Sequence, residues 1–439
     1  MNVKVLKFGG TSLADAEQMK KVIRIVKADE ACRYVVPSAP GKRFSADEKV
    51  TDLLYLCYET AKKGENFGEV FEKIKNRYRD IIQGLGLDFS LEEEFKGIEV
   101  AILHHAGRDY VASRGEYLNG MIMAKALGFT FVDAASCIFF NENGSFAAEE
   151  TNKSLGELLK KTPHAVIPGF YGSMPNGTIK TFTRGGSDIT GAIVARAAEA
   201  DVYENWTDVS GFLMADPRIV KDPKPIGVIT YRELRELSYM GATVLHDESI
   251  FPVRFAGIPI NIRNTNDPDA KGTMIVPSSK VEGNDGNVIT GIAGKKGMSV
   301  ISLEKDMMNA ELGFGRRVLE VLEDLGLSFE HLPSGVDTMS IVVATASLEG
   351  KKERLLDGIC RAVKPDYISL DDGFALIAVV GRGMVSEKGT AQRIFGAIAD
   401  AGVNIRMIDQ GSSEIDIIIG VSEEDYEKSI SAIYNAFAG

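Results

Sequence analysis

The sequence contains few cysteines, and their spacing excludes the sites that cysteine usually builds. Cys32, Cys57, Cys137 and Cys360 are the only four in 439 residues, and no two of them form a C-x-x-C pair. A zinc site or a disulfide framework is therefore not expected, whereas a reducing compartment is. The five histidines show no metal-ligand spacing such as H-x-x-x-H, so we predict no metal site built by the protein alone.

Positive charge and long apolar runs are also scarce. Fifty lysines and arginines against 62 acidic residues leave a net charge of −12, which argues against nucleic-acid binding driven by overall charge. No apolar run is long enough to cross a bilayer, and no leader is recognisable before the apolar segment that starts at Val3. We therefore expect a cytoplasmic protein of two or three domains, without a membrane partner.

The phosphate-binding motifs of the common kinases are absent as well. The sequence has no G-x-x-x-x-G-K-[ST] loop and no H-R-D or D-F-G set. Two other stretches are nonetheless typical of phosphate handling. Residues 3–12 (VKVLKFGGTS) predict an apolar strand that ends in a lysine, two glycines and two hydroxyls. Residues 181–190 (TFTRGGSDIT) predict a glycine turn between a strand and an alanine-rich helix.

The second stretch combines several groups that bind anions. An apolar run at residues 165–168 precedes it, and Asn176-Gly177 indicates a hairpin between the two. Free N–H groups at a helix start can hold an anion, and Arg184 can form paired hydrogen bonds to a carboxylate or phosphate. Ser187 and Asp188 add a hydroxyl and a carboxylate. A helix cap beside a surface arginine explains any one of these residues, but the cluster favours a binding site.

Strands and helices alternate before a small, polar, linker-like segment at residues 277–287. This alternation predicts an α/β domain with an open, mostly parallel sheet and helices on both faces. Ligands of such sheets bind beyond the carboxyl ends of the strands. Residues 7–12, 38–41 and 184–188 all follow apparent strands, so we expect them at one edge of the sheet.

An internal repeat follows the linker. Residues 317–329 align with residues 393–405 at an offset of 76 (393 − 317). Each copy predicts a strand, an amphipathic helix and two further strands plus closing elements, which is a ferredoxin-like unit. A duplicated structural domain for oligomerisation and a small-ligand site at an interface both fit this pattern, which does not decide between them.

Four motifs together resemble those of aspartate kinase. They are residues 7–12 (KFGGTS), 184–188 (RGGSD), 206–209 (WTDV) with 215–218 (ADPR), and 410–414 (QGSSE). They occur in the family's order and span nearly the whole chain. The resemblance implies an amino-acid kinase domain over residues 1–280 and two ferredoxin-like βαββαβ ACT domains. The first ACT domain would cover residues 288–365, completed by a last strand from residues 427–439, with the second inserted in it at residues 366–426.

The resemblance also implies an activity. The family phosphorylates the β-carboxylate of L-aspartate with ATP and Mg²⁺, giving 4-phospho-L-aspartate on the way to lysine, threonine and methionine. An end-product amino acid commonly inhibits it at ACT interfaces. Mg²⁺ would be held mainly by ATP phosphates and water. The assembly that the resemblance implies is a homodimer formed through the ACT domains, or a tetramer.

The family's functional positions can be matched residue by residue. Lys7 would neutralise charge on the transferred phosphoryl group, and Asp188 would hold Lys7. The positions matched to aspartate binding are Ser38, Thr51, Glu116, Phe170, Arg184 and Ser187, with Glu116 on the ammonium and Arg184 on a carboxylate. Those matched to nucleotide binding are Lys7, Gly9, Gly10, Thr207, Asp208, Asp216 and Arg218. Those matched to effector binding are Met308, Gly313, Phe314, Ser328, Phe329 and Glu330. The acid at Glu330 favours lysine over threonine as the effector, because it can pair with a second ammonium.

One segment departs from the family pattern. Where the family usually has a nucleotide-contacting lysine and then a proline, this chain has Thr243 and Asp247. We expect this departure to affect the affinity of the protein for ATP.

Three hypotheses about function stay open: an aspartate kinase with feedback control, another amino-acid kinase such as one acting on glutamate, and an amino-acid sensor with a weakened kinase fold. The paired repeat and residues 410–414 argue against the second.

Overall fold

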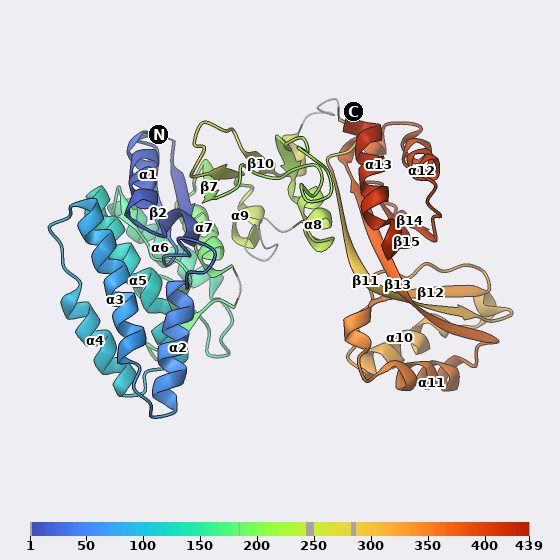
Figure 1. Ribbon diagram of the computed structural model, residues 1–439, viewed down its shortest axis with the longest axis horizontal. Helices are drawn as coiled ribbons and strands as arrows, with labels where there is room; N and C mark the ends of the chain where they lie inside the picture. The colour runs from blue at the N-terminus through green and yellow to red at the C-terminus, as the bar shows by residue number, and fades with distance from the viewer. Residues whose placement is uncertain (1, 184, 243–249, 282–286, 439) are drawn as a thin grey trace. The chain divides into compact units, whose positions relative to one another are not determined.

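The computed structural model describes residues 2–183, 185–242, 250–281 and 287–438. These residues form two compact units, which are described separately (Figure 1). The first unit contains the residues up to 212, residues 225–234 and residues 250–281. The second contains residues 213–224, 235–242 and 287–438.

The first unit is built on one eight-stranded sheet with the strand order β3-β4-β2-β1-β7-β9-β10-β8. Every neighbouring pair is parallel except β9 with β10, which is antiparallel. The mostly parallel α/β sheet predicted from the sequence is therefore confirmed. Its strands are β1 (Lys4–Phe8), β2 (Cys32–Pro37), β3 (Thr130–Phe131), β4 (Ala165–Val166), β7 (Val202–Thr207), β8 (Val228–Thr230), β9 (Ile260–Asn264) and β10 (Thr273–Val276).

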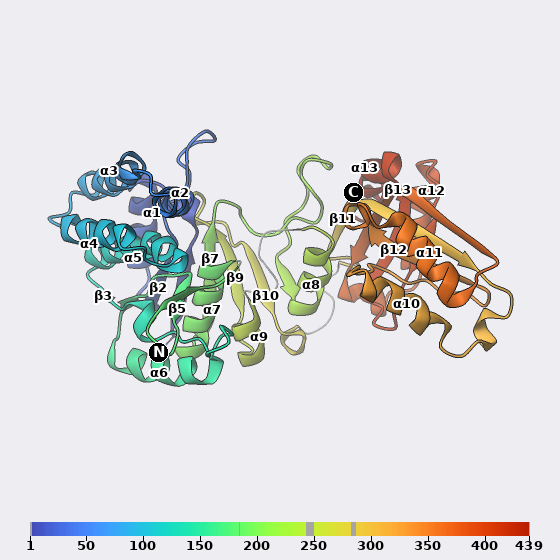
Figure 2. The same ribbon diagram turned by 90° about the horizontal axis from the view of Figure 1, so that it is seen from below.

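Helices cover both faces of this sheet, as Figure 2 shows for α1 and α2 on one side and α6 and α7 on the other. Leu6 and Phe8 of β1 join α1 to α5 in one hydrophobic core, whereas Lys7 points to the face that carries α7. None of the described helices is both long and apolar enough to cross a bilayer. The helices are α1 (Ala16–Lys27), α2 (Val50–Lys62), α3 (Gly68–Leu85), α4 (Glu92–Leu103), α5 (Arg108–Leu127), α6 (Ala148–Lys161), α7 (Gly186–Ala197) and α9 (Phe251–Ala256). Helix α8 (Tyr231–Tyr239) begins in this unit and ends among the residues of the second.

The predicted hairpin before the RGGSD motif is also confirmed. Strands β5 (Tyr171–Ser173) and β6 (Ile179–Thr181) pair antiparallel, and Gly177 turns the chain with a φ of 80°. Helix α7 then starts at Gly186, with Gly185 before it at a φ of 56°. That φ lies in the left-handed region, where glycine has no Cβ penalty, so the two-glycine turn is explained by backbone geometry.

The second unit is built on a five-stranded antiparallel sheet with the order β12-β11-β13-β15-β14. Four helices pack with it. The elements are β11 (Gly291–Glu304), α10 (Phe314–Asp324), β12 (Thr338–Ala344), α11 (Lys352–Val363), β13 (Tyr367–Val380), α12 (Thr390–Asp400), β14 (Met407–Asp409), β15 (Asp416–Ser422) and α13 (Tyr426–Ala438). Helices α10 and α12 have equal length and are offset by 76 residues (390 − 314), which matches the repeat seen in the sequence.

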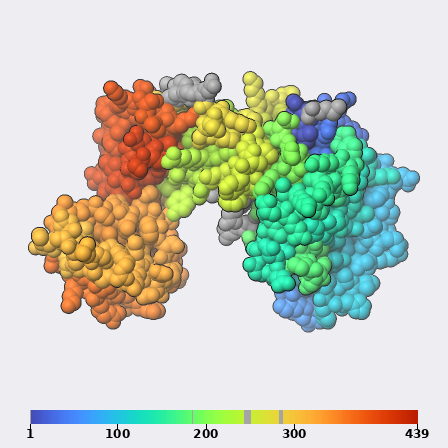
Figure 3. Space-filling model, turned by 180° about the vertical axis from the view of Figure 1, so that it is seen from behind, coloured from blue at the N-terminus to red at the C-terminus, as the bar shows by residue number. Residues whose placement is uncertain are grey.

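The two repeats share their long strands. The pairing of β11 with β13 shifts register near Met298, which divides both strands into halves. The end of β11 and the start of β13 combine with α10, β12 and α11, whose apolar side chains form one core. The other halves combine with α12, β14, β15 and α13. In Figure 3 the two repeats form the orange and the red lobes.

The expected nesting of the repeats, with the second inserted in the first, is wrong. Residues 427–439 were predicted to add a last strand to the first repeat, but residues 426–438 form helix α13. Its buried Ile430, Ile433 and Tyr434 recur at helical spacing, which places them on one face. The edge strand of the second repeat comes instead from residues 291–295 of β11, so the first repeat lies within the second.

Candidate active site

A cavity of about 240 Å³ lies where β1, β2 and the start of α7 meet. It contains every described residue that the sequence assigned to aspartate binding. It also contains the predicted catalytic pair, Lys7 and Asp188, and residues 9 and 10 of the loop that follows β1, which we name the glycine loop. Arg184 lies outside the described residues. The lining consists of Lys7, Gly9, Gly10, Ser38, Thr51, Glu116, Phe170, Gly185, Gly186, Ser187 and Asp188.

Lys7 and Asp188 form a buried ion pair at this cavity. Lys7 is only 7% exposed, and its Nζ lies 2.5 Å from Oδ1 of Asp188. Asn205 donates from Nδ2 to the same oxygen at 2.8 Å, and its Oδ1 accepts from Lys7 at 3.4 Å. The ammonium therefore has a fixed position before any ligand arrives, since charged hydrogen bonds are stronger than neutral ones.

The glycine loop after β1 packs directly against the loop after β2. The N–H of Gly41 donates to the carbonyl of Gly10 at 2.8 Å. A Cβ on Gly41 would lie 2.6 Å from the carbonyl carbon of Gly10, so the two backbones are in contact. Ser38, at the other end of the second loop, donates its N–H to Phe8 and accepts at its carbonyl from Nδ2 of Asn119 at 2.6 Å. The position of each loop thus depends on the other.

Glu116 lies in the middle of α5 and is almost completely buried. It is 5% exposed, and its Oε2 has no hydrogen-bond partner in the structure. Burial raises the pKa of this carboxyl to about 8, although a backbone hydrogen bond from Ala39 and the charge of Arg114 act in the opposite direction. An orphaned acidic oxygen on a cavity wall is well suited to receive a ligand ammonium.

Phe170 and Ser187 close the cavity beside helix α7. Phe170 has a φ of 81°, which is unusual for a residue with a side chain, and its N–H donates to Oγ1 of Thr190 at 3.0 Å. Thr190 in turn donates to the carbonyl of Gly186 at 2.9 Å. A Cβ on Gly169 would lie 2.6 Å from Oγ of Ser187, so only glycine lets the segment approach the helix this closely.

The remaining nucleotide-binding candidates are not on this cavity lining. Thr207 ends β7, and its hydroxyl donates to Asp208 at 3.1 Å. Asp216 and Arg218 belong to the second unit, where they pair with each other at 2.6 Å and Arg218 is exposed. Their role in nucleotide binding stays a prediction. Thr243 and Asp247 lie outside the described residues.

The effector candidates occupy two segments of the first repeat. Met308 and Phe314 pack inside its hydrophobic core, and Gly313 is the N-cap residue before α10, with a φ of 77°. Ser328 and Phe329 are exposed, whereas Glu330 is partly buried.

Glu330 already has a cationic partner in this structure. Oε2 of Glu330 lies 2.5 Å from Nζ of Lys295, which also sits 4.2 Å above the ring of Tyr239. Burial alone would raise the pKa of Glu330, but hydrogen bonds from Lys295 and Tyr239 outweigh it and hold the pKa below its ordinary value.

The sequence did not identify Asn205, Asn119 or Lys295 as parts of these sites. Asn205 directly precedes the WTDV motif, and its role follows from the pairing of β1 with β7, which places it opposite Lys7. Asn119 lies three residues after Glu116 on α5, so helical spacing could have indicated a shared face. No local sequence pattern indicated Lys295, because its partner Glu330 lies 35 residues away in the chain.

Comparison with family models gives two matches. Residues 2–264 match the amino acid kinase family, and residues 377–437 match an ACT domain. The first match covers more than half of the chain and contains every described residue of the cavity lining.

Similar proteins agree with these matches. Aspartokinase 3 of Bacillus subtilis (strain 168) is 40% identical over 99% of this chain and 98% of its own length. The crystal structure of Clostridium acetobutylicum aspartate kinase is 51% identical, covers both chains completely and has a TM-score of 0.92. E. coli aspartokinase III is 25% identical over both full chains, with TM-scores of 0.75 in its complex with aspartate and ADP (R-state) and 0.74 with lysine and aspartate (T-state). The chain therefore belongs to the aspartate kinases of the amino acid kinase family.

Proposed function

We propose that this enzyme transfers the γ-phosphoryl group of ATP to the β-carboxylate of L-aspartate, giving 4-phospho-L-aspartate and ADP. The observation that carries the proposal is the distribution of charge in the cavity. It has a buried lysine ammonium at one wall, held by Asp188, and at another the buried acid Glu116, whose Oε2 has no hydrogen-bond partner. A substrate with both an ammonium and carboxylates is complementary to this arrangement.

The residues act by positioning and by neutralising charge. Glu116 would bind the substrate ammonium, and Arg184 is proposed to bind a carboxylate. A β-carboxylate oxygen then attacks the γ-phosphorus, so a new P–O bond forms while the bond to the ADP oxygen breaks. The attacking carboxylate is already ionised, so no proton has to be removed. Lys7 would stabilise the negative charge on the transferred group, which is what such reactions require of a protein.

Magnesium would reach the site with the nucleotide. The described residues offer no group of three or more His, Cys, Asp or Glu side chains placed to hold a metal ion. Asp188, the acid on the cavity lining nearest to Lys7, is already engaged by Lys7 and Asn205. We therefore propose that ATP phosphates and water hold the ion, which would supply further charge neutralisation. Gly9, Gly10, Thr207, Asp208, Asp216 and Arg218 are the proposed nucleotide contacts.

We also propose that L-lysine inhibits the enzyme through the first ACT domain. The solved complex of E. coli aspartokinase III with lysine supports this proposal. Glu330 is the residue of this chain that would pair with the second ammonium of lysine. In this structure Glu330 is already paired with the ammonium of Lys295. The second ammonium of the effector lysine would therefore have to replace the ammonium of Lys295 at Glu330.

The proposal extends to organisation in the cell. Residues 1–280 would form the kinase domain, since the family match lies within them. Identical chains would assemble through their ACT domains into a dimer or a tetramer. The enzyme would act in the cytoplasm, on the way to lysine, threonine and methionine.

The function is tested by ADP release from the full-length protein with ATP, Mg²⁺ and L-aspartate, with and without L-lysine. We expect turnover that depends on aspartate, is not supported by L-glutamate, and falls when lysine is added. Turnover with glutamate in place of aspartate would favour another amino-acid kinase. Lysine binding without any turnover would favour an amino-acid sensor and would direct attention to Thr243.

Replacing Glu330 separates effector binding from catalysis. We expect Glu330→Gln to raise the lysine concentration for half inhibition at least tenfold, because a charged hydrogen-bonded pair is lost, while kcat without lysine stays within twofold. Lys295→Met is the matched variant and should lower that concentration, since the competing ammonium is removed. Unchanged lysine inhibition in Glu330→Gln would rule out this assignment.

A further inference from the structure

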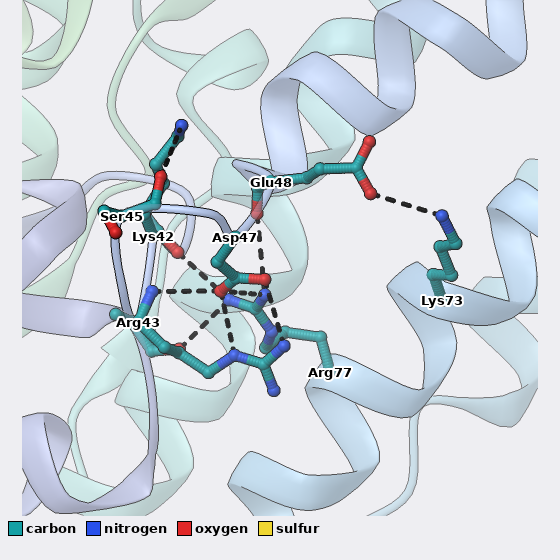
Figure 4. A network of polar contacts seen from close by, with 9 residues as sticks. Lys42, Arg43, Ser45, Asp47, Glu48, Lys73 and Arg77 are labelled. Carbon is teal, nitrogen blue, oxygen red and sulfur yellow. Dashed lines mark hydrogen bonds and ion pairs between the residues drawn. The ribbon is translucent and has the colours of Figure 1, made fainter.

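One buried arginine connects three segments around the active site without reaching the cavity. Arg77 lies on α3 and is 5% exposed. Its Nη1 donates to the carbonyls of Gly41 at 3.0 Å and Ala14 at 3.3 Å. Its Nη2 donates to Oδ2 of Asp47 at 2.7 Å and to the carbonyl of Glu48 at 3.5 Å. Figure 4 shows its guanidinium directed at Asp47.

The acceptors belong to the loops that form the cavity. Ala14 follows the short helix Gly10–Leu13, which contains part of the glycine loop. Gly41 follows Ser38 and touches Gly10 through the backbone. Asp47 and Glu48 are followed by Lys49, the N-cap of α2, and the second residue of α2 is the predicted aspartate contact Thr51. The guanidinium therefore links the glycine loop to the loop of residues 38–49, which we name the aspartate loop.

Asp47 is the central acceptor of this network. It is partly shielded from solvent, with its side chain 9% exposed. The N–H of Arg43 and the Nε of Arg43 each donate to its Oδ2 at 2.9 Å. These hydrogen bonds from Arg43 hold the pKa of Asp47 well below its usual range, with Arg77 acting in the same direction. The carboxylate is thus ionised at neutral pH, and it keeps the aspartate loop folded around Arg77.

We propose that Arg77 is a positioning residue for phosphoryl transfer, which fixes the aspartate loop against the glycine loop and so places Ser38 and Thr51 relative to Lys7. This inference rests on the proposed function. A guanidinium suits the task because it is planar and has five donors, and a single point charge cannot serve four acceptors in different directions. Three of its four bonds go to the aspartate loop, so aspartate binding depends on it more than ATP binding does.

The test compares two arginines of the same helix in the full-length enzyme. Arg77→Gln should raise KM for aspartate at least tenfold, raise KM for ATP less, and lower kcat. Arg77→Lys should recover only part of this loss. Arg79→Gln is the matched control, because Arg79 is 40% exposed on its side chain and pairs with Glu72 and Glu92, away from both loops. It should keep both KM values within twofold.

KM separates positioning from simple loss of folding, because unfolded enzyme lowers the apparent kcat but leaves KM unchanged. An unchanged KM for aspartate in active Arg77→Gln would overturn the inference, as would an equal increase in Arg79→Gln. If Arg77→Gln does not fold, Asp47→Asn decides: a rise of several-fold in KM for aspartate supports the inference, and no change overturns it. Failure of the wild type to turn over aspartate would instead reject the proposed function.

Discussion

Replacing Lys7 by methionine is expected to lower kcat by about 10³-fold, with a much smaller change in the KM for aspartate. Methionine keeps the unbranched apolar stem but removes the ammonium. That ammonium is buried at the cavity and held by Asp188 and Asn205 in a single position. Because negative charge spreads over the phosphoryl oxygens in the transition state, its loss should affect kcat first.

The size of the effect follows from the environment of the ammonium. A fixed donor in a site shielded from water costs about 10²–10³ in rate when it is removed, or roughly 3–4 kcal/mol of transition-state stabilisation. Lys7 is 7% exposed, so bulk water does not replace it easily. Its loss also leaves Asp188 without its cation, which adds a repulsive charge beside the phosphates. We therefore place the expected loss at the upper end of this range.

A second lysine of the same strand is the control. Lys4 lies three residues before Lys7 on β1, so strand alternation directs it to the opposite face, where it pairs with Asp29 and Glu204. Lys4→Met should change kcat by less than threefold, even if thermal unfolding shows a loss of stability. Steady-state ADP release, normalised to folded protein by circular dichroism, measures both variants. A Lys7→Met enzyme within tenfold of the wild-type kcat would contradict the assigned role.

Local patterns in the sequence predict much of the fold and of this site. Asn176-Gly177 predicts the hairpin of β5 and β6, since few other residues accept the required backbone angles. The repeat at an offset of 76 predicts α10 and α12, because helical periodicity is a local property. Lys7 and Ser187 are recognisable because their glycine-rich surroundings are contiguous in the chain.

Properties that depend on tertiary pairing could not be predicted in this way. Asn205 contacts Lys7 only because β7 pairs with β1, although they are about 200 residues apart in the chain. The shared strands β11 and β13 determine which repeat lies inside the other. The pairing of residues 291–295 with β13 cannot be predicted from the periodicity of the sequence, because it joins segments that are far apart in the chain. Arg77 lies on a helix with several charged residues, where its sequence context does not distinguish it from the exposed Arg79.

Burial of Glu116 is the tertiary feature with the clearest consequence for ligand binding. The sequence offers only an acid in a helix, which is most often exposed to solvent. In the structure the side chain has one orphaned oxygen and a pKa raised to about 8. The orphaned oxygen leads to an expected effect on aspartate binding, and the raised pKa leads to an expected pH dependence of that binding.

Replacing Glu116 by glutamine should lower kcat/KM for aspartate by about 10²–10³-fold, mainly through KM. Glutamine keeps the shape of the side chain but cannot pair with the substrate ammonium. Truncating one partner of a buried charged hydrogen bond costs about 2–5 kcal/mol, which corresponds to this range. Glu204→Gln is the control, because Glu204 is equally buried but pairs with Lys4 and with the Nε1 of Trp206. Its KM for aspartate should stay within threefold of the wild type.

The pH dependence gives an independent readout of the same carboxyl. Below pH 8 the buried Glu116 of the free enzyme is protonated, so aspartate must displace a proton before its ammonium can pair. KM for aspartate should therefore fall by up to about tenfold per pH unit as pH rises toward 8 and should level off above it. Glu116→Gln should show no such slope. A slope that persists in this variant would assign the titration to another group.

Stability should respond to the same titration with the opposite sign. The folded-state pKa of about 8 lies above the ordinary value of 4.5, so the unfolded chain ionises Glu116 first as pH rises. Wild-type enzyme without ligand should therefore lose stability relative to Glu116→Gln between about pH 4.5 and 8, with no further change above that window. Saturating aspartate should reduce this difference, because an ammonium beside Glu116 favours its charged form. Denaturant unfolding at several pH values, with and without aspartate, measures both effects, and a constant stability difference would show that Glu116 is not the group whose burial controls aspartate binding.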